Sequence, residues 1–454
     1  MRSIAESAAG MAAGQDRAEA LLEQAQERAG RAADLNALAH VDWDAARAMA
    51  RERDAQARTG APLGPLHGVP VSIKDLFNVR DMPTRAGTRA TLHELPSQEA
   101  SLVTRLRDAG AVIFAKTNMH EIAMGATGEN RWTGDVKNPF DPQRQSGGSS
   151  SGSGVAVATG IGLASIGSDT GGSVRIPAAF CGVTGFKPTF GAIPLDGALN
   201  MSWTCDHAGP LANSVADCAL LYEVMSGRSA AHGKVARAPR LAVPAGWLRG
   251  RLHPAVREHF EPRCAELRAA GAEIVEVATP LLGGASAAYT AIARPEAAWI
   301  HRRQLEAGGE GFSDLVLPAL EAGRQLSAQD YVGAMQERER IRAELDAILA
   351  DFDALLLPSS AALPPLRGQL EIDVEGGRLA VREAVLGQTL AFSLCGLPSL
   401  TVPAGLVADV YGAGTPPLPA GLQLVGRMDG DAALLALGAW VEEKVGDAPA
   451  PAGY

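Results

Sequence analysis

The chain is short of aromatic residues and of cysteine. Only 5% of its 454 residues are aromatic, although 46% are hydrophobic. We therefore expect a core of Ala, Val, Leu and Ile packed closely around many glycines. The five cysteines include no C-x-x-C pair, and an odd number leaves no complete disulfide framework. This cysteine usage favours a reducing compartment.

The sequence also lacks a long apolar run, a secretory signal and a basic cluster. No segment reaches the roughly 18 apolar residues that a membrane-spanning helix needs. The first ten residues, M-R-S-I-A-E-S-A-A-G, contain charges and no apolar core of a signal peptide. The formal net charge is −10, with no basic cluster that would neutralise phosphates. We expect a cytoplasmic protein that binds neither membranes nor nucleic acid.

The pattern of apolar residues changes along the chain. Residues 16–58 are rich in Ala, Glu, Arg and Leu at helical spacing, with one short extended segment between two predicted helices. From Gly68 onward, apolar runs alternate with helical patterns, which favours helices that cover a largely parallel sheet. Between Ala230 and Pro244 the sequence becomes basic and contains proline, which predicts the start of an inserted region.

Two glycine clusters carry serines: G-G-S-S-S-G-S-G at 147–154 and D-T-G-G-S-V-R-I-P-A at 169–178. Glycine lets the backbone bring N–H groups close to a ligand, as both an oxyanion hole and a phosphate cradle require. Neither G-x-x-x-x-G-K-[S/T] nor G-x-G-x-x-G occurs around these clusters, which disfavours a nucleotide-binding loop.

A nucleophile elbow is a second interpretation of the first cluster. G-S-S-S-G at 148–152 fits G-x-S-x-G and would make Ser150 the nucleophile. Serine-rich glycine loops produce this match by chance, and the elbow also needs an acid and then a histidine downstream. The later histidines all lie in the middle of the chain: His207, His232, His253, His259 and His301.

A lysine upstream of both clusters offers a different base, so that Lys74, Ser149 and Ser173 form a candidate catalytic set. Lys74 ends the apolar stretch V-P-V-S-I-K. Burial there could lower its pKa from about 10.4 toward about 7 to 8, and a neutral amine can accept a serine proton. The alternative is that Lys74 pairs with the neighbouring Asp75 at the surface. Spacing alone leaves both interpretations open.

Several long motifs occur in one order along the chain. They are G-P-L-H-G-V-P-V-S-I-K-D, A-K-T-N-M-H-E-I-A-M-G, G-G-S-S-S-G-S-G, S-D-T-G-G-S-V-R-I-P-A, G-V-T-G-F-K-P-T, D-H-A-G-P-L-A-N-S-V-A-D and P-A-G-L-Q-L-V-G-R. In this combination the chain resembles the amidase signature family over nearly its whole length, most densely from about Gly64 to Asp217.

The resemblance implies the fold and its division along the chain. We expect an N-terminal helical arm at 1–60 and one large α/β domain at 61–454. Its mixed, largely parallel central sheet would be covered by helices on both faces. The signature core would span about 64–217 and a variable substrate-pocket region about 230–385. The resemblance also implies no metal or organic cofactor, and a monomer or homodimer.

The family's mechanism assigns roles to the candidate set. By resemblance, Lys74 is the catalytic lysine, Ser149 is a bridging serine preceded by a cis peptide, and Ser173 is the acylating nucleophile. The 24 residues from Ser149 to Ser173 match the family's spacing and select Ser149 over its two serine neighbours. The oxyanion would face the backbone N–H groups of Thr170, Gly171, Gly172 and Ser173.

Supporting roles follow for nearby residues. We expect Asp169 and Arg175 to hold the nucleophile loop through hydrogen bonds and an ion pair, because neither changes charge at neutral pH. Ser150 and Ser151 are expected to hydrogen bond within their loop.

The substrate pocket is predicted from three residues and two segments. Met124, Gly125 and Trp132 are candidate lining residues, and residues 285–331 and 359–383 are expected to shape the rest. Their mixture of Ala, Leu and Pro predicts an open, apolar site.

Three candidate functions remain for a chain with these motifs. The first is a stand-alone hydrolase of small or aryl amides, extending to esters and carbamates (urethanes), with a small molecule as its only partner. The second is the A subunit of a glutamine-dependent amidotransferase. Those subunits carry a carboxylate shortly before N-L-A-G-x-P, whereas L-G-Q-T-L-A-F-S-L-C-G-L-P here offers only apolar residues and Gln388. The third, a catalytically silent binding protein, is disfavoured by the intact candidate set.

Overall fold

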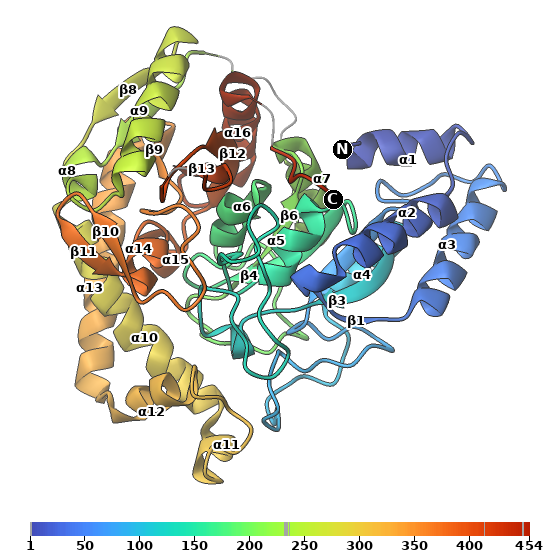
Figure 1. Cartoon of the computed structure of the whole chain (residues 1–454), viewed down its shortest axis with the longest axis horizontal. Helices are drawn as coiled ribbons and strands as arrows, with labels where there is room; N and C mark the ends of the chain where they lie inside the picture. The colour runs from blue at the N-terminus through green and yellow to red at the C-terminus, as the bar shows by residue number, and fades with distance from the viewer. Residues whose placement is uncertain (1, 231–234, 236, 413, 447–448) are drawn as a thin grey trace.

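The structure is a computed structural model that describes residues 2–230, 235, 237–412, 414–446 and 449–454. Residues 231–234 and 236, at the predicted start of the inserted region, lie outside the described residues. An eleven-stranded mixed sheet runs through the described part of the molecule, with strand order β1-β3-β2-β4-β6-β5-β12-β13-β9-β7-β8. Helices flank it on both sides (Figure 1). The prediction of a single α/β domain with a helix-covered mixed sheet is confirmed.

The strands are short and mostly buried. In chain order they are β1 (Leu38–Val41), β2 (Pro70–Lys74), β3 (Val112–Thr117), β4 (Ala164–Asp169), β5 (Thr184–Lys187), β6 (His207–Ala212), β7 (Arg240–Val243), β8 (Glu273–Glu276), β9 (Ala354–Pro358), β10 (Glu371–Val374), β11 (Gly377–Ala380), β12 (Ser399–Val407) and β13 (Leu418–Val425).

The helices range from one turn to almost seven. They are α1 (Ile4–Ala12), α2 (Ala18–Arg31), α3 (Trp43–Ala57), α4 (Ser101–Asp108), α5 (Ser151–Ala158), α6 (Arg175–Cys181), α7 (Val215–Ser226), α8 (Ala245–Leu248), α9 (Pro254–Ala269), α10 (Ala285–Ile300), α11 (Arg302–Glu306), α12 (Leu317–Gln325), α13 (Ala328–Asp351), α14 (Val381–Leu386), α15 (Leu390–Leu394) and α16 (Asp431–Val445), with 3₁₀ turns η1 (Ala33–Leu35), η2 (Glu121–Ala123) and η3 (Pro280–Gly284).

Parallel and antiparallel pairing occupy different parts of the sheet. Parallel pairs join β3 to β2 and β2 to β4, and again β9 to β7 and β7 to β8. The pairs between these two groups, from β4 through β13 to β9, are antiparallel, and so is the edge pair of β1 with β3. Strands β12 and β13 form an antiparallel pair at this centre of the sheet.

Helices α5 and α6 carry the two glycine-serine clusters onto the sheet. They contact each other, and α5 packs against β2 and β4 while α6 packs against β5, β12 and β13. Every residue of both helices is buried. Helices α4, α7, α16 and α9 form a second connected group, in which α7 contacts β5 and β6 and α16 contacts β12 and β13. The small residues of α5, S-G-S-G-V-A-V-A, allow this close approach.

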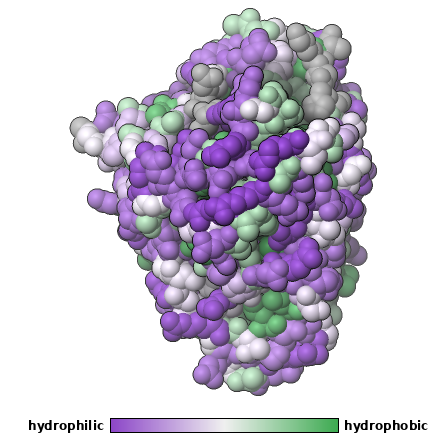
Figure 2. Space-filling view, turned by 90° about the vertical axis from the view of Figure 1, so that its right-hand side faces the viewer, coloured by the Kyte–Doolittle hydropathy of each residue, from purple (hydrophilic) through white to green (hydrophobic). Residues whose placement is uncertain are grey.

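The predicted N-terminal arm joins the main sheet. Its extended segment is β1, which lies between α2 and α3 in the sequence and pairs with β3. The buried residues of α2 are Ala18, Leu22 and Ala25, and those of α3 are Ala46 and Ala50. All other residues of the two helices are partly or fully exposed. The face on which these helices lie is accordingly mostly hydrophilic, with small apolar areas (Figure 2). Among the described residues, no helix is both long and apolar enough to cross a bilayer.

The fold predicts a steric penalty at Gly152. A Cβ there would lie 2.2 Å from the Ala37 carbonyl oxygen and 2.6 Å from that of Asn118, and backbone atoms cannot move aside cheaply. We expect Gly152→Ala to destabilise the protein by about 1 to 3 kcal/mol through overpacking. Gly30→Ala is the control, because nothing lies within 4 Å of its Cβ. That substitution should stabilise helix α2 by about 0.5 to 1 kcal/mol. Thermal unfolding midpoints that move equally in both variants would contradict this packing.

Candidate active site

Lys74 is a buried lysine in contact with two serines. It is the last residue of β2, where all five residues are buried. Its Nζ lies 2.7 Å from Ser149 Oγ and donates a hydrogen bond of 2.8 Å to Ser168 Oγ. Burial lowers the pKa of Lys74 to about 7, even though the charges of Asp169 and Asp206 act to raise it. A neutral amine with a free electron pair is therefore accessible near neutral pH.

The carboxylate next to Lys74 in sequence belongs to a different ion pair. Asp75 Oδ1 lies 3.0 Å from Nζ of Lys116 on β3, and both side chains are buried. Asp75 also accepts a hydrogen bond from the N–H of Arg85 at 3.2 Å. The alternative in which Lys74 pairs with Asp75 at the surface is therefore wrong. Because Lys116 neutralises Asp75, no adjacent carboxylate holds the proton on Lys74.

The first serine loop is fixed by hydrogen bonds on both sides of Ser149. The peptide between Gly148 and Ser149 is cis, as the resemblance implied. The Ser149 carbonyl accepts from the His120 N–H at 3.1 Å, and the N–H of Ser150 donates to the Ser173 carbonyl at 3.3 Å. The two serine loops are thus joined directly beside the candidate bridging serine and the candidate nucleophile.

Neighbouring serines of this loop differ in their contacts. Ser150 Oγ donates to the Ser168 carbonyl at 3.1 Å and accepts from the Ser168 N–H at 3.2 Å. Its hydroxyl therefore holds β4 against the loop, which argues against Ser150 as the elbow nucleophile. Ser151 Oγ is buried with no hydrogen-bond partner among the described residues. The expectation that Ser151 hydrogen bonds within the loop is therefore wrong.

A buried ion pair shapes the nucleophile loop. The Asp169 carboxylate accepts from the N–H groups of Gly172 at 2.8 Å and Val174 at 3.1 Å, and lies 2.9 Å from the Arg175 guanidinium. Both charged side chains are fully buried. Burial alone would raise the pKa of Asp169, but the charge and hydrogen bonds of Arg175 hold it well below its usual range. Asp169 is therefore ionised and fixes the turn that presents Ser173.

Arg175 extends this support to distant segments. Its guanidinium donates to the Thr389 carbonyl at 3.1 Å, to Gln423 Oε1 at 2.7 Å and to Ser393 Oγ at 2.6 Å. The loop is thus tied to α15 and to β13. Gln423 lies within the P-A-G-L-Q-L-V-G-R motif, which is the sequence signal that could have identified it.

The predicted oxyanion hole needs one correction. The Gly172 N–H already donates to Asp169, so it is not free to bind an oxyanion. Gly172 has φ +137°, and a Cβ there would lie 2.3 Å from Thr389 Oγ1, so glycine serves the turn itself. The N–H groups of Gly171 and Ser173 have no hydrogen bond to protein among the described residues. Thr170, Gly171 and Ser173 all line the adjacent cavity.

Asp206 fixes the first residue of the predicted oxyanion hole and was not predicted from sequence. Thr170 Oγ1 donates to it at 2.6 Å, and the N–H groups of Met201 and Ser202 donate at 2.8 and 2.9 Å. Burial raises the pKa of Asp206 to about 6. The sequence signal that could have identified Asp206 is its place at the start of the D-H-A-G-P motif. This motif continues into β6, which pairs with β4.

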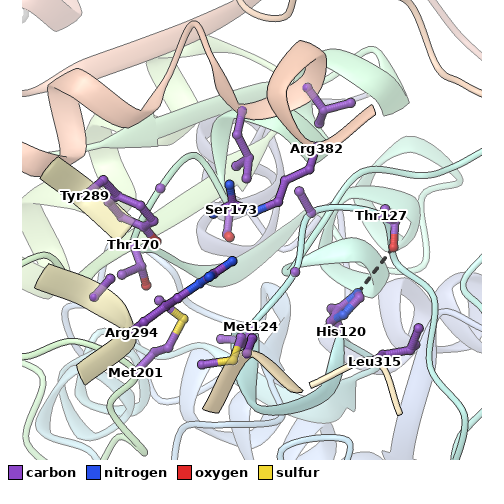
Figure 3. Close-up of a pocket in the computed structure, with 18 of the residues that line it drawn as sticks. His120, Met124, Thr127, Thr170, Ser173, Met201, Tyr289, Arg294, Leu315 and Arg382 are labelled. Carbon is purple, nitrogen blue, oxygen red and sulfur yellow. Dashed lines mark hydrogen bonds between the residues drawn. The ribbon is translucent and has the colours of Figure 1, made fainter. Parts of the chain in front are cut away.

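A cavity of about 290 Å³ opens beside Ser173 (Figure 3). Met124 and Gly125 line it, as predicted. Trp132 does not: its indole N–H donates to the buried carboxylate of Glu121 at 3.0 Å, which draws the ring away from the cavity. The lining residues are His120, Ala123, Met124, Gly125, Ala126, Thr127, Glu129, Thr170, Gly171, Ser173, Met201, Tyr289, Ala293, Arg294, Leu315, Ala319, Val381, Arg382, Val385 and Leu386.

Both predicted pocket segments reach this cavity, and its lining departs from the prediction in one respect. Residues 285–331 contribute Tyr289 and Arg294, and residues 359–383 contribute Arg382. Most other lining residues from these segments are apolar as expected, but each segment also places an arginine in the cavity (Figure 3). Composition averages a segment over all its faces, so it does not show which side chains turn toward the nucleophile.

The chain is similar to known proteins in sequence and in overall fold. The amidase family model matches residues 20–435. The A subunit of the glutamyl-tRNA(Gln) amidotransferase from Anaeromyxobacter sp. (strain K) is 34% identical over 456 residues, which cover 92% of this chain and 90% of that relative. A solved amidase structure is 49% identical, with a TM-score of 0.94 over 98% of this chain and 100% of that one. The native peptide amidase from Stenotrophomonas maltophilia is 29% identical, with a TM-score of 0.82 over 99% and 98% of the two chains.

The match to the family model covers most of the chain and includes both serine loops and Lys74. The chain therefore belongs to the amidase family, and its enzyme class is that of the amidase-signature hydrolases, which act on C–N amide bonds.

Proposed function

We propose that this protein is a serine hydrolase that cleaves the C–N bond of small or aryl amides through an acyl-enzyme. The observation that carries the proposal is the position of Lys74, whose buried Nζ lies 2.7 Å from Ser149 Oγ while Asp75 is paired elsewhere. Ser173 then faces the cavity as the nucleophile. A cavity of about 290 Å³ suits a small substrate.

Acylation begins with a proton relay. Neutral Lys74 accepts the Ser149 proton while Ser149 accepts the Ser173 proton, and Ser173 Oγ attacks the substrate carbonyl. The oxyanion that forms is stabilised by backbone N–H groups of Thr170, Gly171 and Ser173. The C–N bond then breaks, the amine leaves with a proton returned through Ser149, and the acyl group remains bound to Ser173 as an ester.

Deacylation uses the same residues in the same order. Water replaces the amine, gives its proton to Ser149 as it attacks the ester carbonyl, and releases the carboxylic acid from Ser173. The proposed mechanism requires only a carbonyl carbon that Ser173 can attack and a leaving-group atom that can accept a proton. Esters and carbamates (urethanes) therefore fall within the proposed range, with an alcohol or a carbamic acid among the products.

The second candidate is an amidotransferase A subunit, which the relative from Anaeromyxobacter supports. In this chain, however, the segment before C-G-L-P supplies no carboxylate to the cavity: Leu386 lines it, and Gln388 is buried with its Oε1 unpartnered among the described residues. We therefore infer that the protein works as a monomer or homodimer without further subunits. The substrate would be a small molecule, with no nucleic acid or membrane involved.

A panel of aliphatic amides, anilides, aryl carbamates, esters and glutamine tests the proposal. We expect the purified chain to hydrolyse amides without a partner protein, as measured by ammonia or amine release. Turnover of glutamine alone, or only after a partner is added, would favour the amidotransferase instead.

Substitutions test the relay directly. We expect Ser173→Ala to reduce kcat/KM on the order of 10⁴-fold or more, because it removes the nucleophile. Ser149→Ala and Lys74→Met should each reduce it by about 10²- to 10⁴-fold through loss of proton transfer. Ser151→Ala is the matched control, since its hydroxyl is buried in the same loop but has no partner among the described residues. Equal losses in the control and in Ser149→Ala would contradict the assignment.

The pH dependence of kcat/KM should follow Lys74. Only the neutral amine accepts a proton, and its fraction grows as pH rises through the Lys74 pKa of about 7. Activity should therefore fall tenfold per pH unit below about 7 and level off above it. The Asp206 charge raises the pKa of Lys74, so Asp206→Asn should move the inflection to lower pH. A profile that is flat from pH 5 to 8, or an inflection that moves upward, would refute Lys74 as the base.

A further inference from the structure

Two guanidinium groups reach into the cavity beside Ser173. Arg294 extends from α10 and Arg382 from α14, and their charged ends point toward the space next to the nucleophile (Figure 3). Neither has a hydrogen bond or an ion pair with protein among the described residues. Most other arginines of the chain form ion pairs, as Arg175 does with Asp169. These two cations, of which Arg382 is exposed and Arg294 only partly so, therefore have no direct ion-pair partner among the described residues.

The acidic side chains around the cavity are engaged elsewhere. Glu129 lines the cavity, but its Oε1 accepts from the Gly368 N–H at 2.7 Å and its Oε2 from Thr127 Oγ1 at 3.4 Å. Glu383, next to Arg382 in sequence, pairs with Arg251 at 3.3 Å and accepts from Ser286 Oγ at 3.0 Å. Glu383 is thus paired with Arg251, and among the described residues that line the cavity the single carboxylate of Glu129 is outnumbered by the two guanidinium groups.

Two cations in one cavity repel each other unless an anion joins them. Arg294 is half-buried, and burial together with the charge of Arg382 lowers its pKa. The chain as a whole carries a net charge of −10, so this concentration of positive charge is local. A guanidinium presents N–H donors in a planar fork that matches the two oxygens of a carboxylate. The cavity therefore has the donors for a carboxylate, and no carboxylate of the described residues is bonded to them.

We propose that the physiological substrate carries a carboxylate a few bonds from the scissile carbonyl, and that Arg294 and Arg382 bind it. This inference rests on the proposed function, since Ser173 must be the nucleophile. The apolar lining residues Met124, Leu315 and Val385 would contact the carbon chain between carboxylate and carbonyl. The substrate is then a small anionic amide, such as a monoamide of a short dicarboxylic acid or an N-acyl amino acid.

Two pairs of substrates test the proposal and show whether the carboxylate belongs to the acyl part or to the amine part of the substrate. Succinamate against succinamide places the carboxylate on the acyl part, and N-acetylglycine against N-propylacetamide places it on the amine part. We expect kcat/KM to favour the anionic member of one pair by about 10- to 100-fold, as charge-assisted hydrogen bonds would give. The preference should weaken between 0.05 and 0.5 M salt, on the order of the screening expected for charges in an open site.

Variants locate the preference in the two arginines. In Arg294→Gln and Arg382→Gln, the ratio of kcat/KM for the anionic to the neutral substrate should fall by about 10- to 100-fold, mainly through KM. Arg249→Gln removes the same charge from an exposed arginine outside the cavity and should leave the ratio unchanged. An unchanged ratio in both cavity variants, or no preference in the wild-type protein, would overturn the inference while the proposed function stands.

A binding measurement separates the inference from the proposed function. Titration calorimetry with Ser173→Ala and either succinamate or N-acetylglycine requires no turnover. Binding that is lost in the double variants Ser173→Ala with Arg294→Gln or Arg382→Gln supports the carboxylate site even if hydrolysis fails. Binding that survives both arginine substitutions overturns it. Absence of any Ser173-dependent turnover across both substrate pairs and the wider panel would instead count against the proposed function.

Discussion

The site depends on burying Lys74 without giving it a carboxylate partner. The strand that ends at Lys74 is enclosed by β3 and β4, so its amine is removed from water. Asp75 follows at once, and a pair between these neighbours would hold the proton on the lysine. Lys116 on β3 takes Asp75 instead. Because burial disfavours the charged amine, the pKa of Lys74 falls to about 7, which suits a base near neutral pH.

A different buried pair, Asp169 with Arg175, stays charged and holds the nucleophile loop in place. Asp169 and Arg175 are oppositely charged, fully buried and bonded to backbone, and the charge of Arg175 holds the pKa of Asp169 well below its usual range. Their bonds reach α15 and β13, which come from the far end of the chain. The nucleophile loop is thus held by segments that the sequence separates by more than 200 residues. One buried pair fixes the geometry of the loop, while a buried lysine without a carboxylate partner is the proposed base.

The candidate set was identified through the long motifs that resemble the amidase signature family, because spacing alone left the role of Lys74 open. Lys74, Ser149 and Ser173 lie in long motifs whose residues meet through neighbouring strands and loops. The role of Gly172 was misjudged because its N–H has a competing acceptor, Asp169, which a motif does not reveal. The cavity residues Arg294 and Arg382 were missed because their direction is set by how α10 and α14 pack, not by spacing. The antiparallel centre of the sheet likewise depends on where the β12–β13 hairpin inserts, which alternation of helix and strand does not determine.

The most direct test of the central claim is the site and rate of labelling by a fluorophosphonate, which reacts with an activated serine. Peptide mass spectrometry should locate one adduct on Ser173, at a rate that falls on the order of 10²-fold or more in Lys74→Met. An adduct on Ser150, or labelling of Ser173 at an unchanged rate without Lys74, would contradict activation of this serine by the buried lysine.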